Sequence, residues 1–271
     1  MLEMLGVEAR IVGVCESKYI RTDFVQRGLA NGTITDIGEA TAPDIEKLVE
    51  LGPDAMVTSP VGNAPTGRVE KTGIPQIKCV DYMEQHPLGR AEWLRFLSLF
   101  VGKEAVADSI FNDIANSYNE VKSLVADVKQ LPTVLTEMRI GSTWYVPGGQ
   151  SYVANLLRDA GANYLWADNS HAGSVPLSFE SVFERSCEAD FWLIKYNRPQ
   201  ELTYESLKQE YLPYSQFEAF KKRNIFVCNT GKVNFYEETP LRPDWLLREC
   251  VLLFHPHALK GHQRQYYKEM Q

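Results

Sequence analysis

Short apolar runs and amphipathic segments alternate along the first part of the chain. Three short runs with β-branched residues predict strands: residues 10–14, 55–58 and 73–80. The segment from Thr41 predicts a capped helix of about ten residues, which Gly52 and Pro53 end. Residues 1–6 have the pattern of a helical end. Strands that alternate with helices in this way are typical of a parallel α/β sheet.

The same alternation returns after Pro132. The predicted elements are strands at 133–138, 191–195 and 224–229 and helices at 152–160 and 243–254. The segment GSTWYVPGGQS, between the first of these strands and the first helix, contains glycines and a proline and predicts a loop. The two halves of the chain therefore have the same order of elements.

The segment between the two halves has a different pattern. Apolar residues recur there at intervals of three and four, which predicts an amphipathic helix: Ala107, Ile110, Phe111, Ile114, Tyr118, Val121 and Val125. Residues 91–101 are apolar nearly all round, so the helix is buried there or bends at Gly102. We expect an α/β lobe over 1–87, a linking helix over 88–128 and a second α/β lobe over 129–271.

Composition and charge exclude several functions. The 271 residues are 44% hydrophobic, which suffices for one large core or two modest ones. The net charge of −7, without a basic stripe, argues against nucleic-acid binding. No stretch reaches the roughly 20 apolar residues of a membrane-spanning helix. The five cysteines lack CxxC spacing, so neither a zinc ribbon nor a dithiol centre is indicated.

Motifs for catalysis or a resident metal are missing from the sequence. It contains no GxSxG, GxxxxGK[ST], HExxH or GxGxxG. The spacing of His255, His257 and His262 does not fit one helical face, so we do not assign a metal site to them. We expect a protein without catalytic residues or a resident cofactor.

Two glutamates occupy equivalent places in the two halves. Glu46 and Glu180 each follow a plausible N-cap, Asp44 or Ser178, by two residues on a short predicted helix. Acidic residues are also favoured in a first helical turn by the helix dipole alone. On the pattern alone the two positions are therefore equivalent surface sites without an assigned role.

The succession of motifs along the chain resembles one family. The motifs are IVGV, APDIEKLVELGPDAMV, GIPQI, HPLGRAEW, GGQSYVANLLRDAGA and YEETPLRPDWLLRECVLLFHP. They cover residues 5–256 and resemble the solute-binding proteins of vitamin B12, haem and ferric-siderophore importers. The resemblance implies a class III periplasmic binding protein fold, in which two Rossmann-like lobes are bridged by a single long helix and hold the ligand in the cleft between them. It also implies a monomer whose Glu46 and Glu180 dock onto arginines of an ABC transporter permease dimer.

The chain departs from this family at its start. Members normally begin with a signal peptide, often followed by a lipidated cysteine, and then a first strand that leads into the helix whose end residues 1–6 resemble. The sequence shows none of these before residues 1–6. We therefore expect the first lobe to lack its first strand. The resemblance implies a location in the periplasm or at the outer face of the inner membrane, with contact to the membrane only through the permease or a lipid anchor.

The candidate binding residues follow from the chemistry of the expected ligands. Corrin and porphyrin rings are broad, flat and partly apolar, so they bind aromatic platforms with polar groups at the rim. The candidates lie in segments after predicted strands: Trp144, Tyr145, Phe235, Tyr236, Tyr196, Asn197, Asn63 and Arg68. Arg139 is a further arginine after a strand, and solvent exposure or ordinary packing are the alternatives for every one of these residues.

The sequence leaves the ligand open and allows two alternatives to a binding protein. The ligand is cobalamin, haem or a ferric siderophore, and an arginine-rich cleft would favour acidic chelates whereas an aromatic one would favour a corrinoid. One alternative is a chelate-processing enzyme with the same fold. The other is a truncated, non-functional paralogue.

Overall fold

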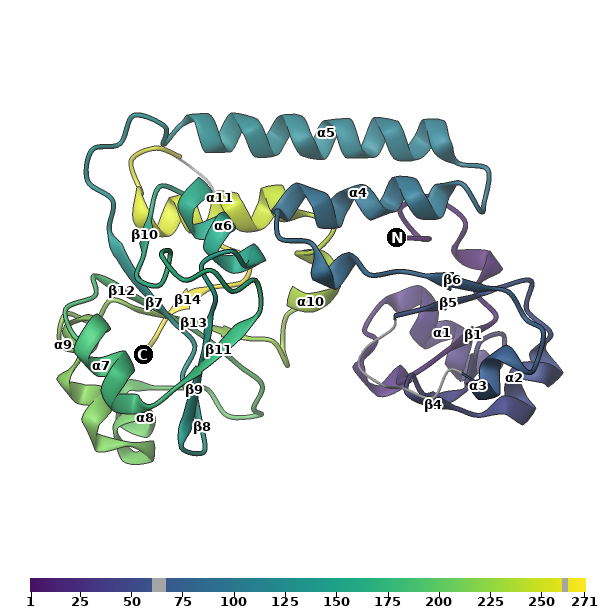
Figure 1. Ribbon diagram of the computed structural model, residues 1–271, viewed down its shortest axis with the longest axis horizontal. Coiled ribbons are helices and arrows are strands. Elements are labelled where there is room, and N and C mark those ends of the chain that lie inside the picture. Colours follow the sequence, from purple (N-terminus) through teal and green to yellow (C-terminus); the bar gives the residue numbers. More distant parts are fainter. Residues whose placement is uncertain (60–66, 260–262) are drawn as a thin grey trace. The chain divides into compact units, whose positions relative to one another are not determined.

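The computed structural model describes residues 1–59, 67–259 and 263–271 of the chain (Figure 1). These residues form two compact units. Unit 1 comprises Met1–Met83 and Glu92–Ser109, and unit 2 comprises Glu84–Ala91 and Ile110–Gln271. The boundaries at Ala91 and Ser109 fall within helices, so two helices contribute residues to both units.

The main sheet of unit 2 is parallel except at one edge. Its strands lie in the order β10-β7-β12-β13-β14, and β14 alone among them is antiparallel to its neighbour. Their bounds are β7 (Thr133–Thr136), β10 (Asn163–Tyr164), β12 (Phe191–Tyr196), β13 (Ile225–Asn229) and β14 (Lys268–Glu269). Every residue of β13 is buried, which explains its continuous apolar run because a central parallel strand is covered on both faces.

A smaller antiparallel sheet in unit 2 corrects one sequence prediction. Its strands β8 (Arg139–Ile140), β9 (Thr143–Pro147) and β11 (Ser174–Leu177) lie in the order β11-β9-β8. The segment GSTWYVPGGQS, predicted as a loop, therefore contains a strand, because the β-prone residues of β9 pair on both sides. Gly148 is needed for close packing, since a Cβ there would lie 2.2 Å from the carbonyl oxygen of His171.

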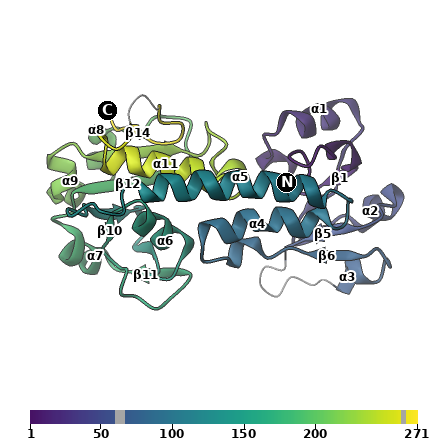
Figure 2. The same cartoon turned by 90° about the horizontal axis from the view of Figure 1, so that it is seen from above.

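The two helices of unit 2 predicted at 152–160 and 243–254 begin and end close to those positions, as α6 (Tyr152–Asp159) and α11 (Pro243–Phe254). Unit 2 also contains α7 (Phe179–Ser186), α8 (Tyr204–Glu210), α9 (Glu218–Lys221) and α10 (Phe235–Glu238), with a 3-10 helix η4 (Leu212–Gln216). Ser151 caps α6 and Ser178 caps α7 through their side-chain oxygens. Both ribbon views show α11 alongside the part of α5 (Glu104–Ser123) that belongs to unit 2 (Figures 1 and 2).

Two helices replace the predicted linking helix over 88–128. The structure has α4 (Pro87–Ser98) and α5 (Glu104–Ser123), separated by residues 99–103. Gly102 has φ of 64°, in the left-handed region that ends helices, so the chain leaves helical geometry at the residue where the sequence allowed a bend. One continuous helix from residue 88 is therefore wrong. The long helix is α5, which is continuous and has residues in both units.

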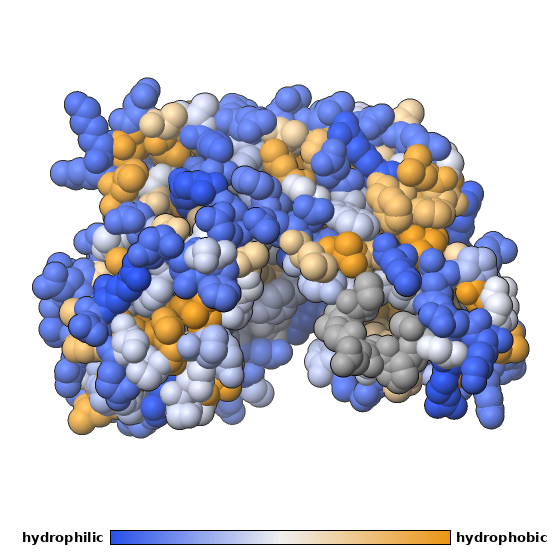
Figure 3. Space-filling model, in the orientation of Figure 1, coloured by the Kyte–Doolittle hydropathy of each residue, from blue (hydrophilic) through white to orange (hydrophobic). Residues whose placement is uncertain are grey.

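The apolar character of residues 91–101 has a partial explanation in unit 1. Leu94 and Leu97 of α4 are buried, whereas Leu99, Phe100 and Val106 are exposed. Figure 3 shows apolar side chains gathered on the surface where α4 ends and α5 begins. This segment is therefore buried on one side only.

Unit 1 is built from short elements around a small core. Its strands are β1 (Gly13–Val14), β2 (Thr35–Asp36), β3 (Gly38–Glu39), β4 (Ala42–Pro43), β5 (Met56–Thr58) and β6 (Gln76–Lys78). Its helices are α1 (Asp23–Asn31), α2 (Ile45–Leu51) and α3 (Gly67–Glu70), with 3-10 helices η1 (Glu8–Arg10), η2 (Ser17–Tyr19) and η3 (Asp81–Met83). β1 pairs with β2 and β5 with β6, both in parallel. The predicted helical end at residues 1–6 is instead a series of turns.

A buried carboxylate holds the C-terminal segment against unit 2. Glu249 of α11 is 3% exposed and accepts backbone N–H groups from Gln265, Tyr266 and Tyr267. Burial raises the pKa of Glu249, although these N–H groups oppose the shift. β14, which follows this segment directly, completes the sheet beside β13.

A second buried carboxylate fixes α5 to unit 2. Asp159, at the end of α6, is 7% exposed and accepts hydrogen bonds from the Tyr118 hydroxyl (2.9 Å) and the Lys122 ammonium (2.9 Å). Both donors lie on α5, one turn apart. Burial and then the Asp159 charge raise the pKa of Tyr118, so this phenol stays protonated and acts as a donor.

We expect Asp159→Ala to lower the free energy of unfolding by about 2–3 kcal/mol, because the buried Tyr118 hydroxyl loses its acceptor. Urea denaturation measures the change. Asp127→Ala removes an exposed carboxylate just beyond α5 and should change the free energy by less than about 0.5 kcal/mol. Equal effects of the two substitutions would show that Asp159 does not anchor the helix.

Candidate functional site

The strongest candidate site lies at the carboxyl ends of the parallel strands of unit 2. In open α/β sheets this edge is the usual position for a ligand. Leu193 of β12 pairs with Thr136 of β7, and Tyr196 pairs with Asn229 of β13, so these strands end side by side. Glu137 directly follows β7, and Lys195 stands next to the end of β12. An acidic and a basic residue thus meet at this edge.

Two buried tryptophans fix the backbone at the end of β7. The indole Nε1 of Trp144 donates to the carbonyl oxygen of Thr136 (3.0 Å), and that of Trp192 donates to the carbonyl oxygen of Glu137 (2.6 Å). The rings stack with centroids 5.6 Å apart, and both residues are 0% exposed. The backbone N–H of Glu137 donates to the carbonyl oxygen of Leu193 (2.8 Å). Both the backbone N–H and the backbone carbonyl group of Glu137 are therefore held by hydrogen bonds.

Glu137 has an unusual backbone conformation. Its φ is 63°, in the left-handed region that non-glycine residues rarely adopt. Such conformations persist where the surrounding structure holds them, and they concentrate at functional sites. Here the hydrogen bonds from Trp192 and to Leu193 supply that constraint.

Glu137 forms an ion pair with Lys195 across the two strands. The Lys195 Nζ donates to the Glu137 carboxylate, and the side chains are 15% and 23% exposed. Burial lowers the pKa of Lys195, but the adjacent carboxylate outweighs burial and holds that pKa above its ordinary value. The ammonium is therefore charged at neutral pH.

Aromatic side chains from α10 adjoin this ion pair. The Phe235 ring is 7% exposed, with its centroid 5.8 Å from the Lys195 Nζ. Tyr236 packs edge-on against Phe235 with centroids 5.4 Å apart, yet it is 66% exposed. The site thus combines one exposed ring with a charged, mostly buried donor.

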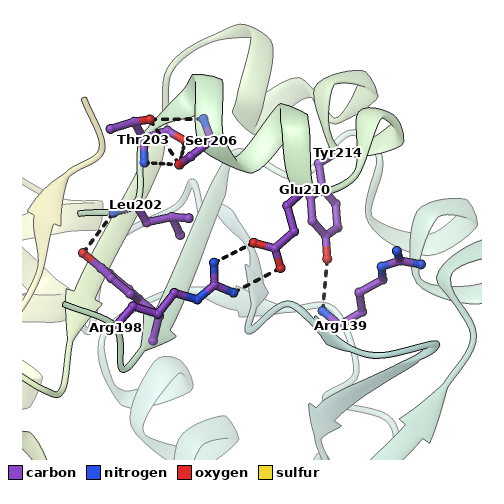
Figure 4. A network of polar contacts seen from close by, with 8 residues as sticks. Arg139, Arg198, Leu202, Thr203, Ser206, Glu210 and Tyr214 are labelled. Atoms are coloured by element: carbon purple, nitrogen blue, oxygen red, sulfur yellow. Dashed lines mark hydrogen bonds and ion pairs between the residues drawn. The ribbon is translucent and has the colours of Figure 1, made fainter. Parts of the chain in front are cut away.

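The loop after β12 is held at several points (Figure 4). The two terminal guanidinium nitrogens of Arg198 donate to the two carboxylate oxygens of Glu210 on α8, at 2.7 and 3.1 Å. The Tyr196 hydroxyl accepts the backbone N–H of Leu202 (3.2 Å) and donates to Glu201 (2.7 Å). A capping box of Thr203 and Ser206 then starts α8. Asn197 therefore stands on a fixed loop, with an exposed side chain.

The predicted aromatic platforms divide into exposed and buried residues. Tyr145 and Tyr236 are exposed and available to a ligand. Tyr196 and Phe235 are buried, and they support the site from below rather than presenting a face to solvent. Trp144 corrects the prediction: it is a core residue, because β9 directs it inward against Trp192, Tyr214 and Phe217.

The predicted residues of unit 1 lie on the surface where the structure describes them. Arg68 lies on α3 with an exposed side chain, and Asn63 lies outside the described residues. Glu46 stands in the first turn of α2, where Asp44 accepts the backbone N–H groups of Glu46 and Lys47, so Asp44 is the predicted N-cap. No ligand contact follows for any of them.

Glu180 is the equivalent residue of unit 2. It stands in the first turn of α7, which Ser178 caps as predicted. Hydrogen bonding to its own backbone N–H, then the Ser178 hydroxyl and the charge of Arg139, hold the pKa of Glu180 below its ordinary value. Glu180 is therefore an ionised surface carboxylate, and its role stays a prediction.

Sequence reasoning missed Glu137 and Lys195. Each is a charged residue next to the end of an apolar strand, in LTEM and LIKY, and this placement is the signal that could have identified them. Their pairing could not be read from the sequence, because it depends on the order of β7 and β12 in the sheet. Within the described ranges, no cluster of His, Cys, Asp or Glu could hold a metal ion. Likewise, in this part of the chain no helix combines the length and apolar character needed to cross a bilayer.

Comparisons with known proteins are consistent with this architecture. The family model for periplasmic binding proteins matches residues 1–230. An uncharacterized lipoprotein of Methanocaldococcus jannaschii is 27% identical over 270 residues, which are 97% of this chain and 63% of the relative. The chain thus spans less than two thirds of that relative. A second lipoprotein of the same organism is 23% identical over 95% of this chain and 67% of its own length.

Solved structures show the same fold at low sequence identity. A periplasmic haem-binding protein of Pseudomonas aeruginosa has a TM-score of 0.74 at 17% identity, covering 100% of this chain and 93% of its own. A periplasmic haem-binding protein of Roseiflexus sp. has a TM-score of 0.73 at 18% identity, covering 95% and 94%. The CeuE protein of Helicobacter pylori with Ni(II) bound has a TM-score of 0.69 at 18% identity, covering 97% and 82%. The predicted class III fold is confirmed.

We expect Trp144→Phe to lower the free energy of unfolding by about 1–3 kcal/mol, because a buried carbonyl loses its donor and the core loses volume. Tyr145→Phe, at the next position of β9, should change the free energy by less than about 0.5 kcal/mol, since Tyr145 is exposed. Chemical denaturation compares the two variants. If Trp144→Phe were as harmless as Tyr145→Phe, the assignment of Trp144 to the core would be wrong.

Proposed function

Because the chain belongs to the periplasmic binding protein family, we propose that it captures a metal chelate and delivers it to the permease of an ABC importer. The candidate ligands are a ferric siderophore, haem or a corrinoid. The protein acts by recognition and carries out no chemical step. Capture in a cleft, which the family resemblance implies, stays a prediction.

The observation that carries this proposal is the polar group at the carboxyl edge of the unit 2 sheet. A charged Lys195 is held there by Glu137, and the exposed ring of Tyr236 packs against Phe235, whose ring lies near the ammonium. A flat ligand with polar groups at its rim requires a ring surface and a directed donor. The solved structures of similar fold include haem-binding proteins and one with bound Ni(II), which supports a ligand that contains a metal.

The same comparisons support a location outside the cytoplasm. The matching family is that of periplasmic binding proteins, and two relatives are named as lipoproteins. We place the protein in the periplasm or at the outer face of the inner membrane.

We expect one chelate from a panel of haemin, cyanocobalamin and several ferric siderophores to bind with Kd below ~1 μM, about −8 kcal/mol. Quenching of tryptophan fluorescence, corrected for absorption by the coloured ligands, measures the binding. Tyr236→Ala should weaken binding about tenfold, because the exposed ring is lost. Tyr19→Ala removes an equally exposed ring of η2 and should have no effect. Binding of no chelate better than ~1 mM would favour a non-functional paralogue.

Docking to the permease is a separate part of the proposal. Glu46 and Glu180 are exposed carboxylates in the first turns of α2 and α7, where they can pair with arginines of a permease. Charged pairs at the rim of an interface increase the rate and orientation of association more than its affinity.

We expect the double variant Glu46→Ala/Glu180→Ala to keep its affinity for the chelate but to reduce uptake into proteoliposomes with the permease at least about tenfold. Glu50→Ala/Glu184→Ala removes exposed glutamates of the same helices and is the matched control. Uptake should also fall with rising salt in the wild type. Equal uptake by both double variants would contradict the assignment of the docking residues.

A further inference from the structure

The Glu137–Lys195 ion pair does not have the properties of a purely structural contact. Removing two charges from water is costly, and buried ion pairs are often replaced by apolar residues without loss of stability. These side chains lie at the edge of the sheet, 23% and 15% exposed, rather than in the aromatic core below. Glu137 is also held in a left-handed conformation that disfavours a side chain. A role in recognition accounts for these features together.

The Lys195 ammonium has unused hydrogen-bonding capacity. An ammonium group carries three N–H donors. Among the described residues its hydrogen-bond acceptor is the Glu137 carboxylate. The Lys195 side chain is 15% exposed at this edge of the sheet, so the remaining donors can meet a ligand there. The Phe235 ring also lies near the Lys195 ammonium, and it can interact with the charge only through the face of its π-system.

We propose that Lys195 binds an anionic oxygen of the chelate, such as a carboxylate or catecholate group at its rim, while Glu137 orients the ammonium and limits the positive charge of the site. The proposal rests on the proposed function and narrows its substrate class to acidic chelates. Charge-assisted hydrogen bonds of this kind are about twice as strong as neutral ones.

The burial of the predicted aromatic residues favours the same class. An aromatic cleft would favour a corrinoid, but three of the predicted aromatic residues, Trp144, Tyr196 and Phe235, are buried. In unit 2 the Glu137–Lys195 pair therefore offers a ligand more than ring stacking does. A ligand with acidic groups matches what remains exposed.

Two substitutions with opposite expected effects test the proposal. Lys195→Met removes the donor and leaves the Glu137 charge, so anionic probes should bind at least about tenfold more weakly. Glu137→Gln keeps an acceptor for Lys195 but removes the negative charge, so the same probes should bind about threefold more tightly. The anionic probes are ferric enterobactin and haemin. The comparison probes are haemin dimethyl ester and neutral cyanocobalamin, whose affinities should change less than about twofold. The cationic ferrioxamine B should respond to each substitution in the opposite direction to the anionic probes.

Controls separate binding from folding. Lys208→Met and Glu184→Gln make the same chemical changes at exposed positions of α8 and α7. The double variant Glu137→Gln/Lys195→Met removes both charges and should fold with nearly wild-type stability. If Lys195→Met fails to fold, the Glu137→Gln variant still decides the outcome.

The outcomes distinguish the two levels of the proposal. Unchanged affinity for anionic probes in both variants, or binding of cyanocobalamin or ferrioxamine B alone, would overturn the role of Lys195 and leave the solute-binding function intact. Weaker binding of anionic probes by Glu137→Gln would also overturn it. Binding of no probe by the wild type would overturn the proposed function itself, and the role of Lys195 with it.

Discussion

Two indole N–H groups buried in the core of unit 2 must find acceptors, because an unpaired buried donor is costly. Trp144 donates to the carbonyl oxygen of Thr136, the last residue of β7, and Trp192 donates to that of Glu137, which follows it. Their stacked rings also fill the space between the two sheets of the unit. The chain direction at Glu137 is therefore fixed by the core, and Glu137 meets Lys195 of the neighbouring strand as a consequence.

Buried carboxylates set the remaining geometry of unit 2. Asp159 holds α5 through Tyr118 and Lys122, and Glu249 holds the C-terminal segment through backbone N–H groups. In each case the charge is balanced by several donors, as burial of a charge requires. These contacts tie a long helix and a terminal strand to the main sheet of unit 2.

Much of this arrangement is predictable from the sequence. The apolar runs at β7, β12 and β13 and the capped helices α2, α6 and α7 have local signals that agree with their tertiary setting. The failures have physical causes as well. In GSTWYVPGGQS, strand pairing and the close approach of another backbone segment determine the conformation, so the glycines mislead. The predicted linking helix is interrupted between α4 and α5, where Gly102 adopts a left-handed conformation. The Glu137–Lys195 pair depends on strand order, which no local pattern carries.

Hydrogen exchange measured by mass spectrometry, with and without a saturating chelate, tests the central claim that ligand binds at the carboxyl edge of the unit 2 sheet. We predict slower exchange in residues 136–139 and 194–198 and in α10, which form that edge. Haemin and ferric enterobactin are suitable ligands for the experiment. Protection confined to α8 and α9, with no change at these segments, would contradict the account.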